Sequence, residues 1–228
     1  MTTSNTYNFS PSIGDLALNA FSRIQVKPPA LVQEHMLQLR IEGNLLQAQW
    51  SNVGVTLWTV DLQTVPLVQG TATYTVPPST VMILDTYIST GSPPTNRIIM
   101  PMSRTDYAAL PQPAEQAVPT TYWFDRLIAP TINLWPVPDG SASYTLSYYR
   151  YRQIQDATFA GGNQPEVQYL FLDAWTAGLA HRLSRHFAPS LEALRKVDAA
   201  EAFDLAAKQN VEGVNFYVYP ALQAYWRP

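Results

Sequence analysis

The 228-residue sequence contains no cysteine, which excludes disulfide bonds and thiolate metal sites. No apolar run approaches the ~20 residues that a membrane-spanning helix requires. The first ten residues, MTTSNTYNFS, lack the basic start and the apolar core of a signal peptide. We therefore expect a soluble protein that is made in a cytoplasm and makes no contact with a membrane.

Charged residues are scarce as well, at 14% of the chain against ~25% in an average soluble domain. The net charge of −3 gives no basic excess for tight DNA binding, so DNA close to the protein should slide past it. The 13 tyrosines and 19 prolines, by contrast, are numerous. A surface poor in charge and rich in aromatic residues is often covered by partners. The alternative is a β-rich domain that uses tyrosine in its strands.

The motifs of common catalytic and metal sites are missing. The sequence has no HExxH and no GxSxG motif, and no Gly-Lys-Ser/Thr follows Gly161-Gly162. His181 and His186 are five residues apart, about 140° around a helix, so they do not share a face. We expect no catalytic residue, no cofactor and no metal site. Two carboxylates of the middle segment could still form a glycosidase pair, which is a weak signal: Asp85, Asp106, Glu115, Asp125 and Asp139.

Two helices are predicted at the start of the chain. Ser12 and Asp15 form a capping-box-like pair ahead of an apolar repeat of three- and four-residue steps. Lys27-Pro28-Pro29 ends this helix, and a second helix follows from about residue 30 to 50. Three residues widen its apolar stripe beyond what one neighbour could cover: Leu31, Ile41 and Leu45. We therefore expect this second helix to contact partners on two sides.

The apolar period changes to two after residue 53, which predicts strands. The expected strands are 55–60, 71–76, 81–88, 97–100, 131–135 and 144–151. Proline- and glycine-rich turns separate them, and a short helical turn is expected at 103–110. Residues 53–153 are therefore expected to form a mostly antiparallel β module.

Helices are predicted again in the C-terminal third. Asn163 and Glu166 are spaced as the cap of a helix that runs to about residue 187, and Ser190 is placed as the cap of a last helix. Small residues in the first of these helices would allow close helix contact: Ala174, Ala177, Gly178 and Ala180. In the last helix, five residues are expected to face inward: Ala193, Val197, Ala200, Phe203 and Ala207.

These elements predict an α+β fold with an inserted module. The helices of residues 1–52 and 154–210 are expected to form one four-helix bundle, with the antiparallel β module of residues 53–153 inserted between its halves. Residues 211–228 have no helical period and are expected to form an extended C-terminal tail.

The tail is unusually aromatic. Burying its five aromatic side chains would contribute roughly 19–31 kcal/mol at most, whereas ordering the segment would cost on the order of 27 kcal/mol. Because these terms nearly cancel, we expect the tail to become ordered on a neighbouring chain; packing on its own domain is the alternative. The expected partner-binding residues are Phe216, Tyr217, Tyr219, Tyr225, Trp226 and Arg227.

Three stretches resemble the head-to-tail adaptors of tailed, mainly short-tailed, bacteriophages, also called tail tubular protein A or head-completion proteins. The first is the helical pair followed by QTVPL (63–67) and GTATYTVP (70–77). The second is MSRTDY (102–107), PTTYWFDR (119–126) and INLWPVPD (132–139), and the third is the alanine-rich last helix pair with its aromatic tail. The second is the most specific, because aromatic pairs that lead into a Trp-Pro-x-Pro turn are uncommon.

The resemblance implies a structural virion protein at the head–tail junction, assembled in the host cytoplasm. It implies a homo-oligomeric ring, a dodecamer, that binds the portal protein above and the tail tube or nozzle protein below. Genomic DNA would cross the lumen during ejection without specific binding. The resemblance further implies that the helices line the ring, that the tail reaches the portal, and that the protein has no catalytic residues.

Two other functions are compatible with the residues. A carbohydrate-binding or attachment module of a phage tail would use Trp58, Trp123 and Trp135 as sugar platforms. It would bind glycans as an isolated monomer. A cell-wall hydrolase would instead lose turnover when a single acidic residue is changed.

Overall fold

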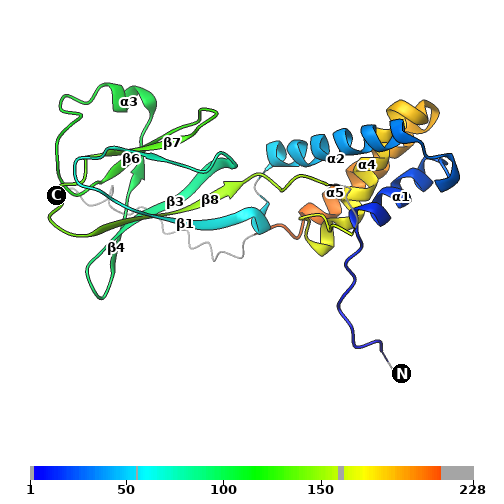
Figure 1. Ribbon diagram of the computed structural model, residues 1–228, viewed down its shortest axis with the longest axis horizontal. Coiled ribbons are helices and arrows are strands. Elements are labelled where there is room, and N and C mark those ends of the chain that lie inside the picture. The colour runs from blue at the N-terminus through cyan, green and yellow to red at the C-terminus, as the bar shows by residue number, and fades with distance from the viewer. Residues whose placement is uncertain (1–2, 55, 159–161, 212–228) are drawn as a thin grey trace, which may run out of the picture.

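The computed structural model describes residues 3–54, 56–158 and 162–211, and this part of the chain has an α+β fold. It is elongated, with a helical lobe at one end and a β lobe at the other (Figure 1). The chain enters the β lobe after the second helix and returns to the helical lobe after the last strand. The expected insertion of a β module between two helical segments is therefore present.

The helical lobe contains α1 (Ile13–Arg23), α2 (Gln33–Val53), α4 (Leu172–Phe187) and α5 (Glu192–Ala207). The expected capping box starts α1, because Ser12 Oγ accepts a hydrogen bond from the Asp15 N–H at 3.1 Å and Asp15 accepts one from the Ser12 N–H. The short helix α3 (Arg104–Ala108) lies in the β lobe and confirms the helical turn expected at 103–110.

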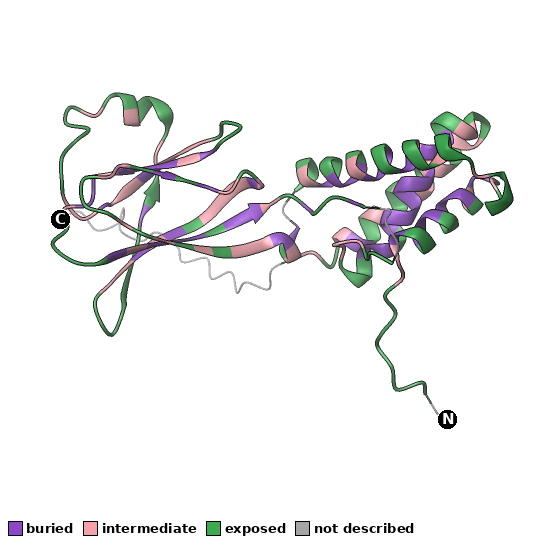
Figure 2. Ribbon diagram, in the orientation of Figure 1, coloured by how far each residue is buried: buried purple, intermediate pink, exposed green. Residues whose placement is uncertain are grey.

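The expected four-helix bundle is not supported, because the helical lobe is organised around α4. Within the described residues, α1, α2 and α5 each pack closely on α4. Helix α4 is buried on nearly every side (Figure 2), and Trp175, Leu179 and Leu183 have no exposed surface. The reason is compositional. Small residues surround its axis, so neighbours approach from three sides, whereas a bundle helix keeps one face in solvent.

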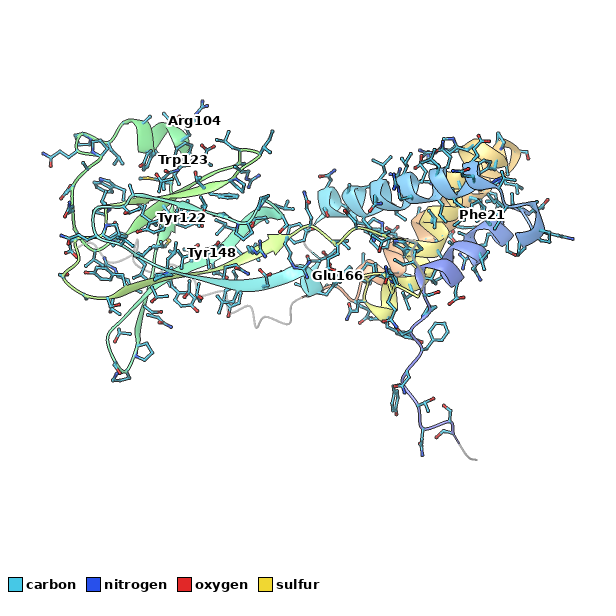
Figure 3. The ribbon with its side chains drawn as sticks, viewed as in Figure 1. Phe21, Arg104, Tyr122, Trp123, Tyr148 and Glu166 are labelled. Carbon is cyan, nitrogen blue, oxygen red and sulfur yellow. The ribbon has the colours of Figure 1, made fainter. Side chains whose placement is uncertain are left out.

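The β lobe consists of two four-stranded sheets. The first has the order β1 (Val60–Pro66), β8 (Tyr144–Arg152), β3 (Thr80–Thr90) and β4 (Thr95–Ile98), all antiparallel. The second has the order β2 (Thr73–Thr75), β7 (Thr131–Trp135), β6 (Thr121–Asp125) and β5 (Met100–Pro101), in which the β5–β6 pair is parallel. One apolar core joins the sheets, and Tyr122 and Tyr148 lie in it (Figure 3).

The strand expected at 131–135 is present as β7, whereas the first expected strand, 55–60, was wrong. Leu57–Thr59 form a 3-10 turn, and β1 begins only at Val60. The turn is closed by the Thr56 and Thr59 hydroxyls, which lie 2.8 Å apart. The strand at Thr121–Asp125 was not expected.

The helix starts expected in the C-terminal third were also wrong. Helix α4 begins at Leu172, and Glu166 pairs with Arg152 instead of capping a helix. Ser190 lies within the 3-10 turn Pro189–Leu191, and α5 begins after it. In both places a 3-10 turn leads into the helix without a side-chain cap.

The inward face expected for α5 was largely wrong. Ala193, Val197 and Ala200 are exposed, whereas Ala206 is buried and Phe203 is half-buried. The helix has alanine or another apolar residue on nearly every side, so its sequence does not define one face.

Candidate assembly surfaces

Helix α2 carries an apolar face that its own lobe does not cover. Leu37, Ile41 and Leu45 are 50%, 42% and 48% exposed. Their four-residue spacing places them on one side of the helix, opposite the buried Leu39 and Trp50. We call these three residues the α2 outer face. Ile41 and Leu45 of the wide apolar stripe lie on this face, whereas Leu31 is half-buried against the helical core, and the expected contact with partners on two sides stays a prediction.

The inner side of α2 is fixed on α4 by close packing. A Cβ atom on Gly178 would lie 2.9 Å from Leu46 Cδ1, so the glycine allows α2 to approach. This agrees with the close helix contact expected from the small residues of α4. The contact determines which side of α2 is buried and leaves the α2 outer face pointing away from the lobe.

A charged cluster holds the same helix pair. The buried Glu42 carboxylate accepts hydrogen bonds from Arg182 at 2.9 Å and from His186 at 3.1 Å. Burial raises the pKa of Glu42, but the hydrogen bonds from Arg182 and His186 outweigh it, so the pKa lies below its ordinary value. Arg182 also donates to Gln49 Oε1 at 2.8 Å. Glu42 is therefore charged at neutral pH and fully paired.

A cleft of about 450 Å³ separates α2 from α5 above α4. Its floor is apolar and includes Trp50, Gly178 and Phe203, whereas Arg185 and Lys196 line its edge. Beside it, α5 exposes a second apolar set, Leu194, Val197 and Leu205. We call these three residues the α5 outer face. The helical lobe thus offers two separate apolar faces, one on each side of the cleft.

A smaller groove of about 290 Å³ lies between α1 and α2. It is lined mainly by apolar side chains, among them Ala17, Leu18, Phe21, Leu31 and Met36. We call it the α1–α2 groove.

The two lobes are joined by a network of ion pairs. Arg152, at the end of β8, pairs with Asp61 of β1 and with Glu166 in the segment before α4 (Figure 3). Arg150 donates two further hydrogen bonds to Asp61, at 2.7 and 3.0 Å. The hydrogen bond from Arg150 lowers the pKa of Asp61, and that from Arg152 lowers the pKa of Glu166.

The three tryptophans considered as sugar platforms do not all lie together, because Trp123 and Trp135 share one face of the second sheet whereas Trp58 is at the lobe junction. Trp58 packs on Phe171 at the lobe junction and donates to the Glu166 carbonyl at 3.1 Å. Trp123 lies against Tyr107 of α3 with ring centroids 5.2 Å apart. Trp135 Nε1 donates to the Gln112 carbonyl. Each ring is thus engaged by its own chain.

Two of the three histidines are paired with carboxylates within the fold. His181 contacts Glu192 at 3.1 Å, and His186 contacts Glu42. Across the part of the chain that the structure describes, no three His, Asp or Glu side chains are grouped as metal ligands. The same residues include no helix that is long and apolar enough to cross a membrane.

The aromatic tail lies outside the described residues. This applies to all six expected partner-binding residues, Phe216, Tyr217, Tyr219, Tyr225, Trp226 and Arg227, so their role stays a prediction.

Comparison with known proteins gives one family. The family model described as SU10 adaptor protein matches residues 37–222, which includes both sheets, α4, α5 and most of α2. No curated protein matches the chain.

Proposed function

The chain belongs to the SU10 adaptor protein family, which makes it a structural adaptor protein of a bacteriophage particle, and we propose that it forms the ring between portal and tail. In this proposal, copies of the chain, twelve by the resemblance described above, close a ring at the head–tail junction. The portal binds on one side, the tail tube or nozzle protein binds on the other, and the genome crosses the lumen.

The observation that carries the proposal is the α2 outer face. Covering a row of exposed apolar side chains with a neighbouring molecule removes them from water and so stabilises the assembly. A ring requires two different faces on each subunit, because the contact between subunits is head-to-tail. The α2 outer face and the α5 outer face, separated by the cleft, supply such a pair.

The charge of the chain agrees with a channel. A net charge of −3 provides little attraction for phosphate, so DNA that passes through such a ring would not be retained by bulk charge. We further propose that the aromatic tail, residues 211–228, binds the portal or a neighbouring copy.

The test is to mix the purified chain with the portal protein of the same phage and to examine the product by electron microscopy. We expect a monomer alone and rings attached to portal in the mixture. The double variant Ile41→Asp/Leu45→Asp should fold normally but form no rings. A matched control is Ile128→Asp, at a β6–β7 turn position that is 98% exposed, which should still form rings. Rings formed by the double variant, or separate particles with the natural chain, would contradict the proposal.

The tail is tested separately by deleting residues 211–228. We expect a folded, soluble monomer that no longer joins the portal. A deletion variant that unfolds would instead show that the tail packs on its own domain.

A further inference from the structure

The chain begins with an extended arm that leaves the helical lobe. Residues 3–11 have no regular secondary structure and point away from the helices (Figure 1). Tyr7 is 99% exposed and Phe9 is 69% exposed. The arm TSNTYNFSP contains no charged residue. An aromatic side chain with almost no contact on its own fold favours burial against another surface.

The arm ends next to Ser12, which lines the α1–α2 groove, but Phe9 is held outside the groove. The Phe9 ring contacts the Tyr169 ring edge-on, with centroids 6.3 Å apart. The Ile13 N–H donates to the Asn163 carbonyl at 2.8 Å. Tyr169 and Asn163 belong to the segment before α4, and neither lines the groove. The arm is therefore directed past its own groove, which stays open.

The groove has the size and chemistry to take an aromatic side chain. Its volume of about 290 Å³ is roughly twice that of a 150 Å³ apolar cavity that binds benzene. Leu18 and Met36 on its rim are partly exposed, and methionine adapts well to aromatic rings. The nearby carboxylate of Asp15 already accepts a hydrogen bond from the Ser12 hydroxyl at 2.7 Å. An uncharged arm can thus enter without leaving a buried charge unpaired.

We propose that the arm of one copy lies in the α1–α2 groove of the next copy, with Tyr7 in the groove. This inference rests on the proposed ring, and it names one contact within it. The nine residues of the arm span about 30 Å when extended, whereas a helix with its side chains is about 10–12 Å across. The arm is therefore long enough to pass from one helical lobe to a neighbouring one.

The test uses the absence of cysteine in this chain, because the engineered cysteines are then the only thiols that the two tagged chains contribute. Two chains with different tags carry Asn8→Cys and Met36→Cys, so that Tyr7 and Phe9 are kept. They are mixed with portal protein and oxidised, and we expect a disulfide-linked heterodimer. A mixture of Asn8→Cys with Ile128→Cys is the control and should give no heterodimer.

A second measurement uses the side chain itself. Tyr7→Ala should weaken assembly by about 10- to 100-fold, the range of an interface hot spot, and Tyr7→Phe should weaken it much less. Because Tyr7 is exposed in the single chain, neither variant should change the Tm of the monomer.

Three outcomes would overturn the arm contact. The first is the absence of the heterodimer, and the second is unchanged assembly of Tyr7→Ala. The third is a disulfide that closes within one chain in the double variant Asn8→Cys/Met36→Cys, because the arm would then occupy its own groove. Rings without the heterodimer would contradict the arm contact but leave the proposed function intact. Heterodimers without rings would support the arm contact and contradict the proposed ring.

Discussion

The guanidinium of Arg182 on α4 donates to the buried carboxylate of Glu42 on α2 across 2.9 Å. Glu42 lies at the border between the buried side of α2 and the α2 outer face, and Arg182 also reaches the carbonyl of Leu45 at 3.4 Å. This pair therefore fixes the rotation of α2 about its axis, and with it the direction in which the apolar face points.

Replacing Glu42 by alanine should destabilise the helical lobe by about 2–3 kcal/mol, because Arg182 and His186 lose their shared acceptor in a largely buried site. Chemical denaturation of the monomer measures this change. Asp173→Asn is the matched control. It breaks the exposed Arg23–Asp173 pair and should cost less than about 1 kcal/mol. Equal effects of the two variants would contradict the role of Glu42.

The lobe junction should make stability depend on pH. The pKa values of Glu166 and Asp61 are lowered in the folded chain, first by hydrogen bonds from Arg152 and Arg150 respectively. Carboxylates of this kind stabilise the fold above their unfolded pKa, near pH 4, and the contribution is lost as the pH falls through the lowered folded pKa. Thermal melts between pH 7 and 2 should show this loss.

The variant Glu166→Gln should lose part of that pH dependence. Arg152→Met should lose at least as large a part, because Arg152 pairs with Asp61 as well as with Glu166, and the double variant should lose little more than Arg152→Met alone. A Glu166→Gln variant with the full natural slope would show that the junction does not contribute.

Variants at Gly178 distinguish the effect of helix propensity on stability from the effect of packing between α2 and α4. Gly178→Ala should change the free energy of unfolding by less than about 1 kcal/mol, since better helix propensity offsets the movement of Leu46. Gly178→Val should destabilise the chain by roughly 1–3 kcal/mol, because α2 must move away from α4. Equilibrium unfolding of both variants gives the comparison, and similar values for the two would show that the contact is loose.

Gly140 is required by a turn of the β lobe. Its φ of +73° is unfavourable for other residues, and an added Cβ would lie 2.8 Å from the Gln69 side chain. Gly140→Ala should therefore destabilise the chain by about 1–2 kcal/mol. Gly54→Ala is the control: its φ of 172° suits any residue and no atom lies near its Cβ position. The Tm of both variants checks the difference.

Local signals in the sequence predicted the elements that local interactions form. The Ser12–Asp15 capping box, the strand at 131–135 and the turn at 103–110 all follow from nearby residues. The excess apolar width of α2 includes Ile41 and Leu45, which are exposed, while the contact with partners that it predicts has yet to be tested.

The features that the sequence did not predict depend on contacts between residues far apart in the chain. Glu166 has the spacing of a helix cap, but it pairs with Arg152, which only the fold brings close. The burial of α4 on three sides depends on where its neighbours pack, and the alanine-rich α5 defines no face by itself. The α1–α2 groove also required the structure, although the alternation of Tyr7 and Phe9 in an uncharged segment is a signal for the arm.

The β lobe leaves and rejoins the helices through adjacent strands. Val60 at the start of β1 is the register partner of Tyr151 near the end of β8. The chain therefore enters and leaves the β lobe on two neighbouring strands, directly opposite each other. A foreign domain with closely spaced ends could therefore be grafted at this point without cutting the helical core. The whole β lobe could be exchanged in the same way while the contacts among the helices are kept.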